Sequence, residues 1–234
     1  MKKTTKVWLM IATSLILVGC ILAKPFMVKY ETTTYEVSKD FSDISISTDT
    51  ADIIFALSDD GTCKVECYEE ENAKHSVAVE NDVLIVKTNK SWYDYIGYSF
   101  GWSKITIYLP KEEYSELSIN ESTGTVEIPK DCLFENVNIS TSTGDVNFCA
   151  SVSKLVKIKT STGNICVENI SAGALDLSVT TGKVTVSGVT CQDDITVSVV
   201  TGNAYLTDSS CRSVISSATT GNISLNNVIQ EVHP

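Results

Sequence analysis

Hydrophobic and polar positions in residues 117–230 follow a pattern that repeats every 19 or 20 residues. A short motif ending in Thr-Gly occurs six times, and its glycines are spaced by 20, 19, 19, 20 and 19 residues. In each copy, apolar residues dominate seven and five positions before the glycine and two and four positions after it. This alternation predicts two short strands per copy, one on each side of the glycine, each with one buried face.

A coil of this size cannot bury its apolar face alone, so the copies must stack on one another. The sequence therefore predicts an all-β fold, a parallel β-solenoid of about six coils over residues 117–230. At about 4.8 Å per coil, the rod would be about 29 Å long. The glycines are expected at a corner, where φ is positive or the backbones approach closely. They are Gly124, Gly144, Gly163, Gly182, Gly202 and Gly221.

A column of threonines precedes these glycines and is expected to form a structural ladder along the corner. Its members are Thr123, Thr143, Thr162, Thr181, Thr201 and Thr220. An ice-binding or flat-surface role would need several parallel ladders on a flat strand, so a structural role is favoured.

Residues 41–116 are expected to form an N-terminal β region ahead of the solenoid. Ile44, Ile46, Ile53 and Phe55 match the apolar positions of the repeat if Ala51 takes the place of the glycine, which indicates a degenerate first coil. Strands are predicted over 63–68 and 105–109, with a hairpin over 76–87 that turns at 80–82. Residues 25–40 are polar and Thr-rich and are interpreted as a linker.

An aromatic segment occupies residues 92–102 within this region. One hypothesis makes it a platform for a glycan or a partner, and the other makes it a loop that covers the open end of the core. Its glycines favour a loop without indicating a ligand. The aromatic residues are Trp92, Tyr93, Tyr95, Tyr98, Phe100 and Trp102.

The first 24 residues have the pattern of a membrane segment. Lys2, Lys3 and Lys6 precede an uncharged run from 7 to 23. The favoured interpretation is an uncleaved single transmembrane helix, and the alternative is a lipoprotein signal with lipidation at Cys20. In both cases the basic flank predicts a cytoplasmic N-terminus and an extracytoplasmic C-terminal domain.

The charge balance narrows the choice of partners. The chain has a net charge of −11, and residues 25–234 carry 14 basic against 29 acidic residues. Nucleic acid is therefore excluded as a partner, because its phosphates require a basic surface.

No catalytic, cofactor or metal site is expected from the sequence. There is no CxxC pair and there are only two histidines, so the spacing offers no zinc-binding set. Outward columns of the repeat do not stack two acids in adjacent coils, which argues against glycan chemistry. Cys191 and Cys211 each follow a glycine by nine residues, in a column with Leu133 and Ala172. The spacing of adjacent coils is compatible with a disulfide between them, but the favoured interpretation is free thiols that fill the core.

The run Ile-Thr-Ile-Tyr-Leu-Pro at 105–110, followed by the Ser-Thr-Gly copies from 122–124 onward, carries a family resemblance. The chain resembles a bacterial family of β-strand-repeat proteins known as a putative adhesin domain of unknown function. The resemblance covers about residues 40–230. It implies a β-solenoid displayed at the cell envelope and assigns no catalytic residues, and some relatives are associated with envelope-stress responses.

Three functional hypotheses follow. The first is a non-enzymatic, membrane-anchored extracytoplasmic module with adhesin-like surface binding of a glycan or protein, or a scaffold role. The second is an envelope-stress sensing or regulatory protein whose acidic domain binds cationic peptides or a membrane partner. The third and most remote is a glycan-active β-helix enzyme. Few residues follow the last coil, so self-association through the solenoid end is also a hypothesis.

Overall fold

The computed structural model of the chain describes residues 29–71, 73–89 and 102–230. The predicted membrane segment at 1–24 and Cys20 lie outside these residues. Among the described residues there is no helix long and apolar enough to span a membrane. The strands are β1 (Tyr30–Val37), β2 (Asp43–Leu57), β3 (Cys63–Glu70), β4 (His75–Glu80), β5 (Val83–Thr88), β6 (Ser103–Leu109), β7 (Glu113–Thr123), β8 (Val126–Ile128), β9 (Leu133–Thr143), β10 (Val146–Phe148), β11 (Ser151–Glu168), β12 (Ser171–Ser187), β13 (Thr190–Cys191), β14 (Asp194–Cys211), β15 (Ser213–Thr220) and β16 (Ile223–Gln230).

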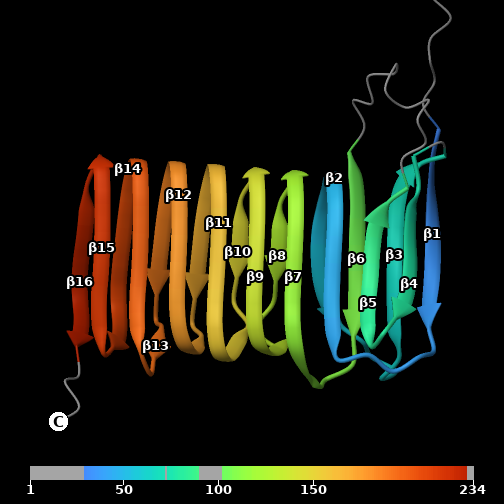
Figure 1. Cartoon of the computed structure of the whole chain (residues 1–234), viewed down its shortest axis with the longest axis horizontal. Helices are drawn as coiled ribbons and strands as arrows, with labels where there is room; N and C mark the ends of the chain where they lie inside the picture. Colours follow the sequence, from blue (N-terminus) through green and yellow to red (C-terminus); the bar gives the residue numbers. More distant parts are fainter. Residues whose placement is uncertain (1–28, 72, 90–101, 231–234) are drawn as a thin grey trace, which may run out of the picture.

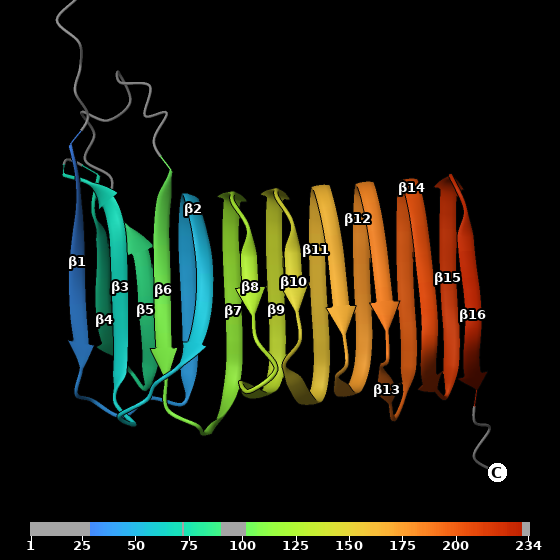
Figure 2. The same ribbon diagram turned by 180° about the vertical axis from the view of Figure 1, so that it is seen from behind.

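The predicted parallel solenoid of about six turns is confirmed. From β7 to β16 the chain winds into a rod whose coils stack side by side (Figures 1 and 2). Neighbouring coils pair in parallel, and the motif stays in register, as in the pairs Thr123↔Thr143 and Thr201↔Thr220. The prediction of two strands per coil is wrong for three coils, because β11, β12 and β14 each run through their glycine as one long bent strand.

The glycine column allows the backbones of adjacent coils to approach closely at this bend. All six glycines have φ between 135° and 153°. A Cβ built on Gly163 would lie 2.0 Å from the carbonyl oxygen of Gly144, and the other glycines of the column would make similar clashes. Glycine is therefore required here for two reasons, backbone conformation and space.

A second corner column lies six residues after the glycines. Asn169, Gly188, Asp208 and Asn227 occupy this position, and all four have positive φ values. Asn, Asp and Gly are the residues that adopt this conformation at least cost. The Asn227 amide also donates a hydrogen bond to the Asp208 carboxylate, 2.6 Å away, so these side chains connect adjacent coils.

The core is a continuous set of apolar columns inside the rod, as the alternation predicts. Ile119, Ile139 and Ile158, for example, stack in successive coils and are at most 1% exposed. One column differs from its expected register. Phe134, and not Leu133, lies in the interior column with Val152 and Ala172, because the first turn holds one more residue. Leu133 is 36% exposed.

The degenerate first coil is also confirmed. β2 pairs in parallel with β7 and β8, so that Ile44 lies opposite Leu117 and Ile53 opposite Val126. Towards the N-terminal end, β2 continues into two short sheets. One half of β2 pairs with β5, which pairs with β4 in an antiparallel hairpin turning at Asn81 and Asp82.

The other half of β2 pairs with β6, followed by antiparallel β3 and β1. Interpreting residues 25–40 as a linker is wrong for Tyr30–Val37, which form β1 along the full length of β3. The threonine-rich sequence suits a strand because β-branched residues favour extended backbone. The N-terminal end is thus a two-sheet sandwich, and β1 and β4 are its outermost strands (Figure 1).

Candidate binding site at the N-terminal end

A groove of about 690 Å³ separates β1 from β4. Residues 34–39 line one side and residues 77–80 line the other. Among the described residues, β1 pairs only with β3 and β4 only with β5, so each strand has a second edge outside any ladder. Val37, Val77 and Val79 are half-buried and pack against the core, which gives the groove an apolar floor.

The hairpin geometry shows which backbone groups of β4 face the groove. Glu80 and Val83 flank a two-residue turn and therefore form a hydrogen-bonded pair. Because such pairs alternate in an antiparallel ladder, Ala78 bonds to β5 while Val77 and Val79 direct their N–H and C=O groups to the other edge. His75 agrees with this alternation, because its carbonyl accepts a hydrogen bond from the Tyr35 hydroxyl at 3.0 Å.

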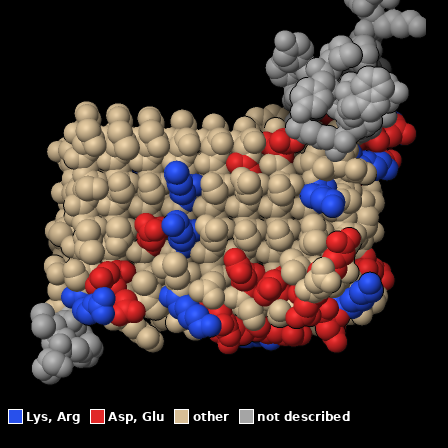
Figure 3. Space-filling model, viewed as in Figure 1, with Lys and Arg blue, Asp and Glu red and all other residues tan. Residues whose placement is uncertain are grey.

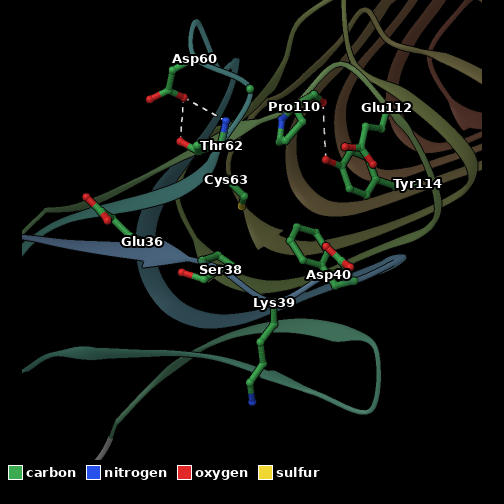
Figure 4. Close-up of a pocket in the computed structure, with 13 residues that line it drawn as sticks. Glu36, Ser38, Lys39, Asp40, Asp60, Thr62, Cys63, Pro110, Glu112 and Tyr114 are labelled. Atoms are coloured by element: carbon green, nitrogen blue, oxygen red, sulfur yellow. Dashed lines mark hydrogen bonds between the residues drawn. The ribbon is translucent and has the colours of Figure 1, made fainter.

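A second cavity of about 560 Å³ lies on the other side of the segment that follows β1 (Figure 4). Its lining is acidic, with the carboxylates of Glu36, Asp40, Asp60 and Glu112 against a single cation, Lys39. Figure 3 shows that acidic side chains gather along the same N-terminal half of the rod.

Asp60 holds its charge at the mouth of this cavity. The Thr62 hydroxyl and backbone N–H and the Ser58 hydroxyl all donate hydrogen bonds to its carboxylate, at 2.7, 2.9 and 2.7 Å. These donors hold the pKa of Asp60 well below its usual range. Asp60 therefore stays ionised at neutral pH, and the excess of carboxylates over cations in the lining suits a cationic ligand.

Beneath the end of the groove lies a buried polar cluster, which we define as Cys67, Glu69, His75 and Thr48. Glu69 and His75 are 0% and 4% exposed, and the Glu69 Oε2 atom lies 2.7 Å from both the backbone nitrogen and Nδ1 of His75. His75 Nε2 lies 3.1 Å from the Thr48 hydroxyl. Cys67 is fully buried, and burial, followed by the charge of Glu69, raises the pKa of its thiol to about 12.

From Thr48, a polar interior column continues into the solenoid. We define it as Thr48, Glu121, Thr141 and Thr160, which lie opposite one another in successive coils. Glu121 is 2% exposed, and neither of its carboxylate oxygens has a hydrogen-bond partner of good geometry. Burial raises the pKa of Glu121 to about 8, and the nearby Ala51 backbone offsets only part of that shift. The carboxyl is therefore protonated in the folded protein at neutral pH.

The sequence-predicted site residues have mixed outcomes. Trp92, Tyr93, Tyr95, Tyr98 and Phe100 lie outside the described residues, so the aromatic platform stays a prediction; its last member, Trp102, is 67% exposed. The corner glycines and the threonine ladder occupy the expected columns, and Thr50 extends the ladder by pairing with Thr123.

The cysteines of the described residues are free thiols, as the sequence interpretation favoured for Cys191 and Cys211. The prediction that no metal-ligating set exists rested on spacing along the chain. The fold brings ligand atoms of Cys67, Glu69 and His75 within 4.8 Å of one another. The sequence did contain a signal for this cluster. Cys67 and Glu69 stand two residues apart in the alternating pattern of β3, which places both side chains on its inner face.

Comparison with known protein families identifies the family to which this architecture belongs. The family described as Toastrack DUF4097 matches residues 41–227. The chain belongs to this family. The match confirms the resemblance inferred from the repeats. It covers the Toastrack solenoid and the part of the N-terminal sandwich that follows residue 41, so β1 lies outside it. DUF4097 is a domain of unknown function, so membership alone assigns no activity.

Two solved structures align with the Toastrack chain at low sequence identity. A putative adhesin from Bacteroides fragilis NCTC 9343 aligns with a TM-score of 0.56 and 22% identity, over 85% of this chain and 97% of the other. A putative lipid binding protein from Parabacteroides distasonis ATCC 8503 has a TM-score of 0.49 and 14% identity, over 85% of this chain and 96% of the other. The likeness to the Bacteroides fragilis protein concerns the fold alone. A search of the curated proteins found no match to the chain.

Proposed function

We propose that this Toastrack chain is a non-enzymatic, adhesin-like binding module that holds an extended segment of a partner protein in the groove between β1 and β4. The observation that carries the proposal is the pair of strand edges that face each other across about 690 Å³. An extended peptide pairs with such edges through main-chain hydrogen bonds, and its alternate side chains enter apolar pockets.

The lining of the groove supports this choice of ligand. Val77 and Val79 present backbone groups to the groove, and Val37 contributes apolar surface from the opposite side. Glu36 and Glu80 stand at the rim, and within the described part of the chain Lys39 is the only cation that lines the groove. A segment that alternates apolar and basic residues would match both the floor and the rim.

The test measures binding of two fluorescent peptides, (Val-Lys)4 and (Val-Glu)4, to the full chain by anisotropy. We expect (Val-Lys)4 to bind and (Val-Glu)4 to bind at least tenfold more weakly. Val79→Pro removes a groove-facing N–H and should abolish binding, whereas Val79→Ala should retain most of it because the backbone donor remains. Equal binding by wild type and Val79→Pro would contradict the proposal.

A second candidate function is capture of a cationic peptide in the acidic cavity, as expected of an envelope-stress sensor. Its support is the cluster of Glu36, Asp40, Asp60 and Glu112 around that cavity. Binding there would fall steeply with salt and would be lost in Asp60→Asn and Glu112→Gln but kept in Val79→Pro. Salt-insensitive binding of a glycan that is lost on Trp102→Ala would instead favour the aromatic segment.

We further propose that the module is displayed outside the membrane by residues 1–24, on the sequence argument given above. In cells expressing the full chain, carbonate washing should leave it in the membrane fraction, and external protease should degrade it. Metabolic labelling with a fatty acid that is lost in Cys20→Ser would indicate the lipoprotein alternative. Recovery of the chain in the soluble fraction would contradict both forms of anchoring.

A further inference from the structure

We propose that Cys67, Glu69 and His75 form a binding site for a divalent transition-metal ion of the zinc class. The three side chains supply a thiolate, a carboxylate and an imidazole, a ligand combination that zinc and cobalt favour. Their ligand atoms lie within 4.8 Å of one another, and all three residues are buried. This site is distinct from the groove proposed above and does not depend on it.

The ligand geometry follows from the fold. Cys67 and Glu69 are two residues apart on β3, so both side chains point into the sandwich. The turn after β3 then brings His75, the first residue of β4, against Glu69. In a tetrahedral site with metal–ligand distances of about 2.0–2.3 Å, ligand atoms lie about 3.3–3.8 Å apart. Side-chain adjustments of about 1 Å therefore suffice to enclose an ion.

A buried carboxylate oxygen without a hydrogen-bond partner independently points to a cation. Glu69 Oε1 is buried without a hydrogen-bond partner, while Oε2 accepts hydrogen bonds from His75. An unsatisfied carboxylate oxygen in the interior is costly, and a cation bound to Oε1 removes that cost. The Cys67 thiolate and the Glu69 carboxylate together balance the charge of a divalent ion.

The surroundings of the His75 ring can also hold the imidazole tautomer that a metal requires. His75 Nε2 lies 3.1 Å from Thr48 Oγ1, which in turn accepts a hydrogen bond from Thr88 at 3.4 Å. Without an ion, Nδ1 donates its proton to Glu69 Oε2 at 2.7 Å. When an ion takes the Nδ1 lone pair, the ring proton lies on Nε2, and the ring donates it to Thr48. Ligating histidines are commonly held in this way by a second hydrogen bond. Binding forms the Cys67–metal bond and releases the thiol proton to solvent.

Three protein ligands leave one position of a tetrahedral site for water. A site with one open position is typical of metals that also meet a substrate, but Cys67, Glu69 and His75 are all buried, which argues for a structural ion. The cluster ties β3 to β4, strands that belong to the two different sheets of the sandwich. A bound ion would thus crosslink the two sheets at the end of the groove.

The test uses the full chain, stripped of metal under reducing conditions and dialysed against zinc or cobalt. We expect one zinc ion per chain and a rise in melting temperature on zinc addition. The cobalt form should show sulfur-to-cobalt charge-transfer absorption, which reports a cysteine ligand directly. Cys67→Ser should lose this absorption and bind zinc at least tenfold more weakly.

Matched variants separate ligation from folding. Cys63→Ser alters another buried cysteine of β3 outside the cluster and should keep both the stoichiometry and the absorption. Thr48→Val should keep the absorption but weaken binding about 10–100-fold, because only the hydrogen bond to the ligand is lost. Absence of stoichiometric zinc in the wild type, or equal loss in Cys63→Ser and Cys67→Ser, would overturn the proposal.

Discussion

The Tyr35 hydroxyl donates a hydrogen bond to the main-chain oxygen of His75, joining the two outermost strands of the sandwich at 3.0 Å. Tyr35 comes from β1 and His75 from β4, and these strands do not pair with each other in a ladder. The bond therefore spans one end of the groove and restrains the opening between the two sheets.

Removing this hydroxyl should loosen the N-terminal end. We expect Tyr35→Phe to lower the free energy of unfolding by about 1 kcal/mol, the usual net effect of one lost hydrogen bond. Hydrogen exchange should also accelerate in β4. The control is Tyr30→Phe, whose hydroxyl donates a hydrogen bond from β1 to the Glu70 side chain of β3, and which should leave β4 unchanged. Equal protection of β4 in wild type and Tyr35→Phe would contradict this role.

The glycine column should tolerate no side chain. In Gly163→Ala the new Cβ would meet the Gly144 carbonyl at 2.0 Å, so we expect a loss of more than about 3 kcal/mol or failure to fold. Gly61→Ala separates the two causes, because Gly61 also has a positive φ of 73° but no atom lies within 4 Å of its Cβ position. Its cost should be about 1 kcal/mol, from backbone conformation alone. Chemical denaturation of the two variants measures the difference.

Stability should depend on pH through Glu121. Its pKa is raised to about 8 in the folded state, so the folded chain keeps a proton that the unfolded chain releases above its ordinary value of 4.5. Stability is then full below about pH 4.5 and falls as the pH rises towards 8. At pH 7 the loss is about 3 kcal/mol.

Glu121→Gln removes this titration and should flatten the pH profile, with the largest gain in stability near pH 8. Glu127→Gln, an exposed change in the same coil, serves as control and should keep the wild-type profile. Thermal unfolding between pH 4.5 and 8.5 measures both. A profile of Glu121→Gln that still falls across this range would show that another group is responsible.

The C-terminal end should associate with a second copy. Leu225 occupies a column whose preceding member, Leu206, is fully buried, yet it is 48% exposed because no described strand stacks beyond β16. We expect concentration-dependent dimers in analytical ultracentrifugation that Leu225→Lys abolishes. Ile215→Lys, on the outer face of the same coil, should not affect them, since that side chain is 55% exposed and points away from the end. A wild type that stays monomeric at all concentrations would refute the prediction.

The sequence predicted the solenoid well because its repeats carry redundant information. Six copies reported the same columns, so one irregular residue such as Ser216 did not obscure the pattern. A signal for the second corner was also present, since Asn169, Gly188, Asp208 and Asn227 stand at equal distances from their glycines. The register of Leu133 and Phe134 was not predictable, because the position of the extra residue in the first turn depends on how that turn closes.

The N-terminal sandwich could be predicted only in part. Its hairpin and β6 have local signals, but β1 has no repeat to define it, and its pairing with β3 spans 26 or more residues. The candidate sites were missed for a related reason. Glutamate and histidine usually indicate a position at the protein surface. Glu69 and His75 are buried only because the two sheets pack over them.

The close contact along the glycine column has a consequence for how the rod can vary. With carbonyl oxygens seated where side chains would otherwise stand, the spacing between coils at this bend has no room to change. The distance between coils is therefore fixed at this bend. Differences in the number of residues per coil, which is already 19 or 20, are taken up by the turns at the opposite corner. Insertions and deletions should therefore occur on the side away from the glycine column, and the rod should lengthen or shorten only by whole coils.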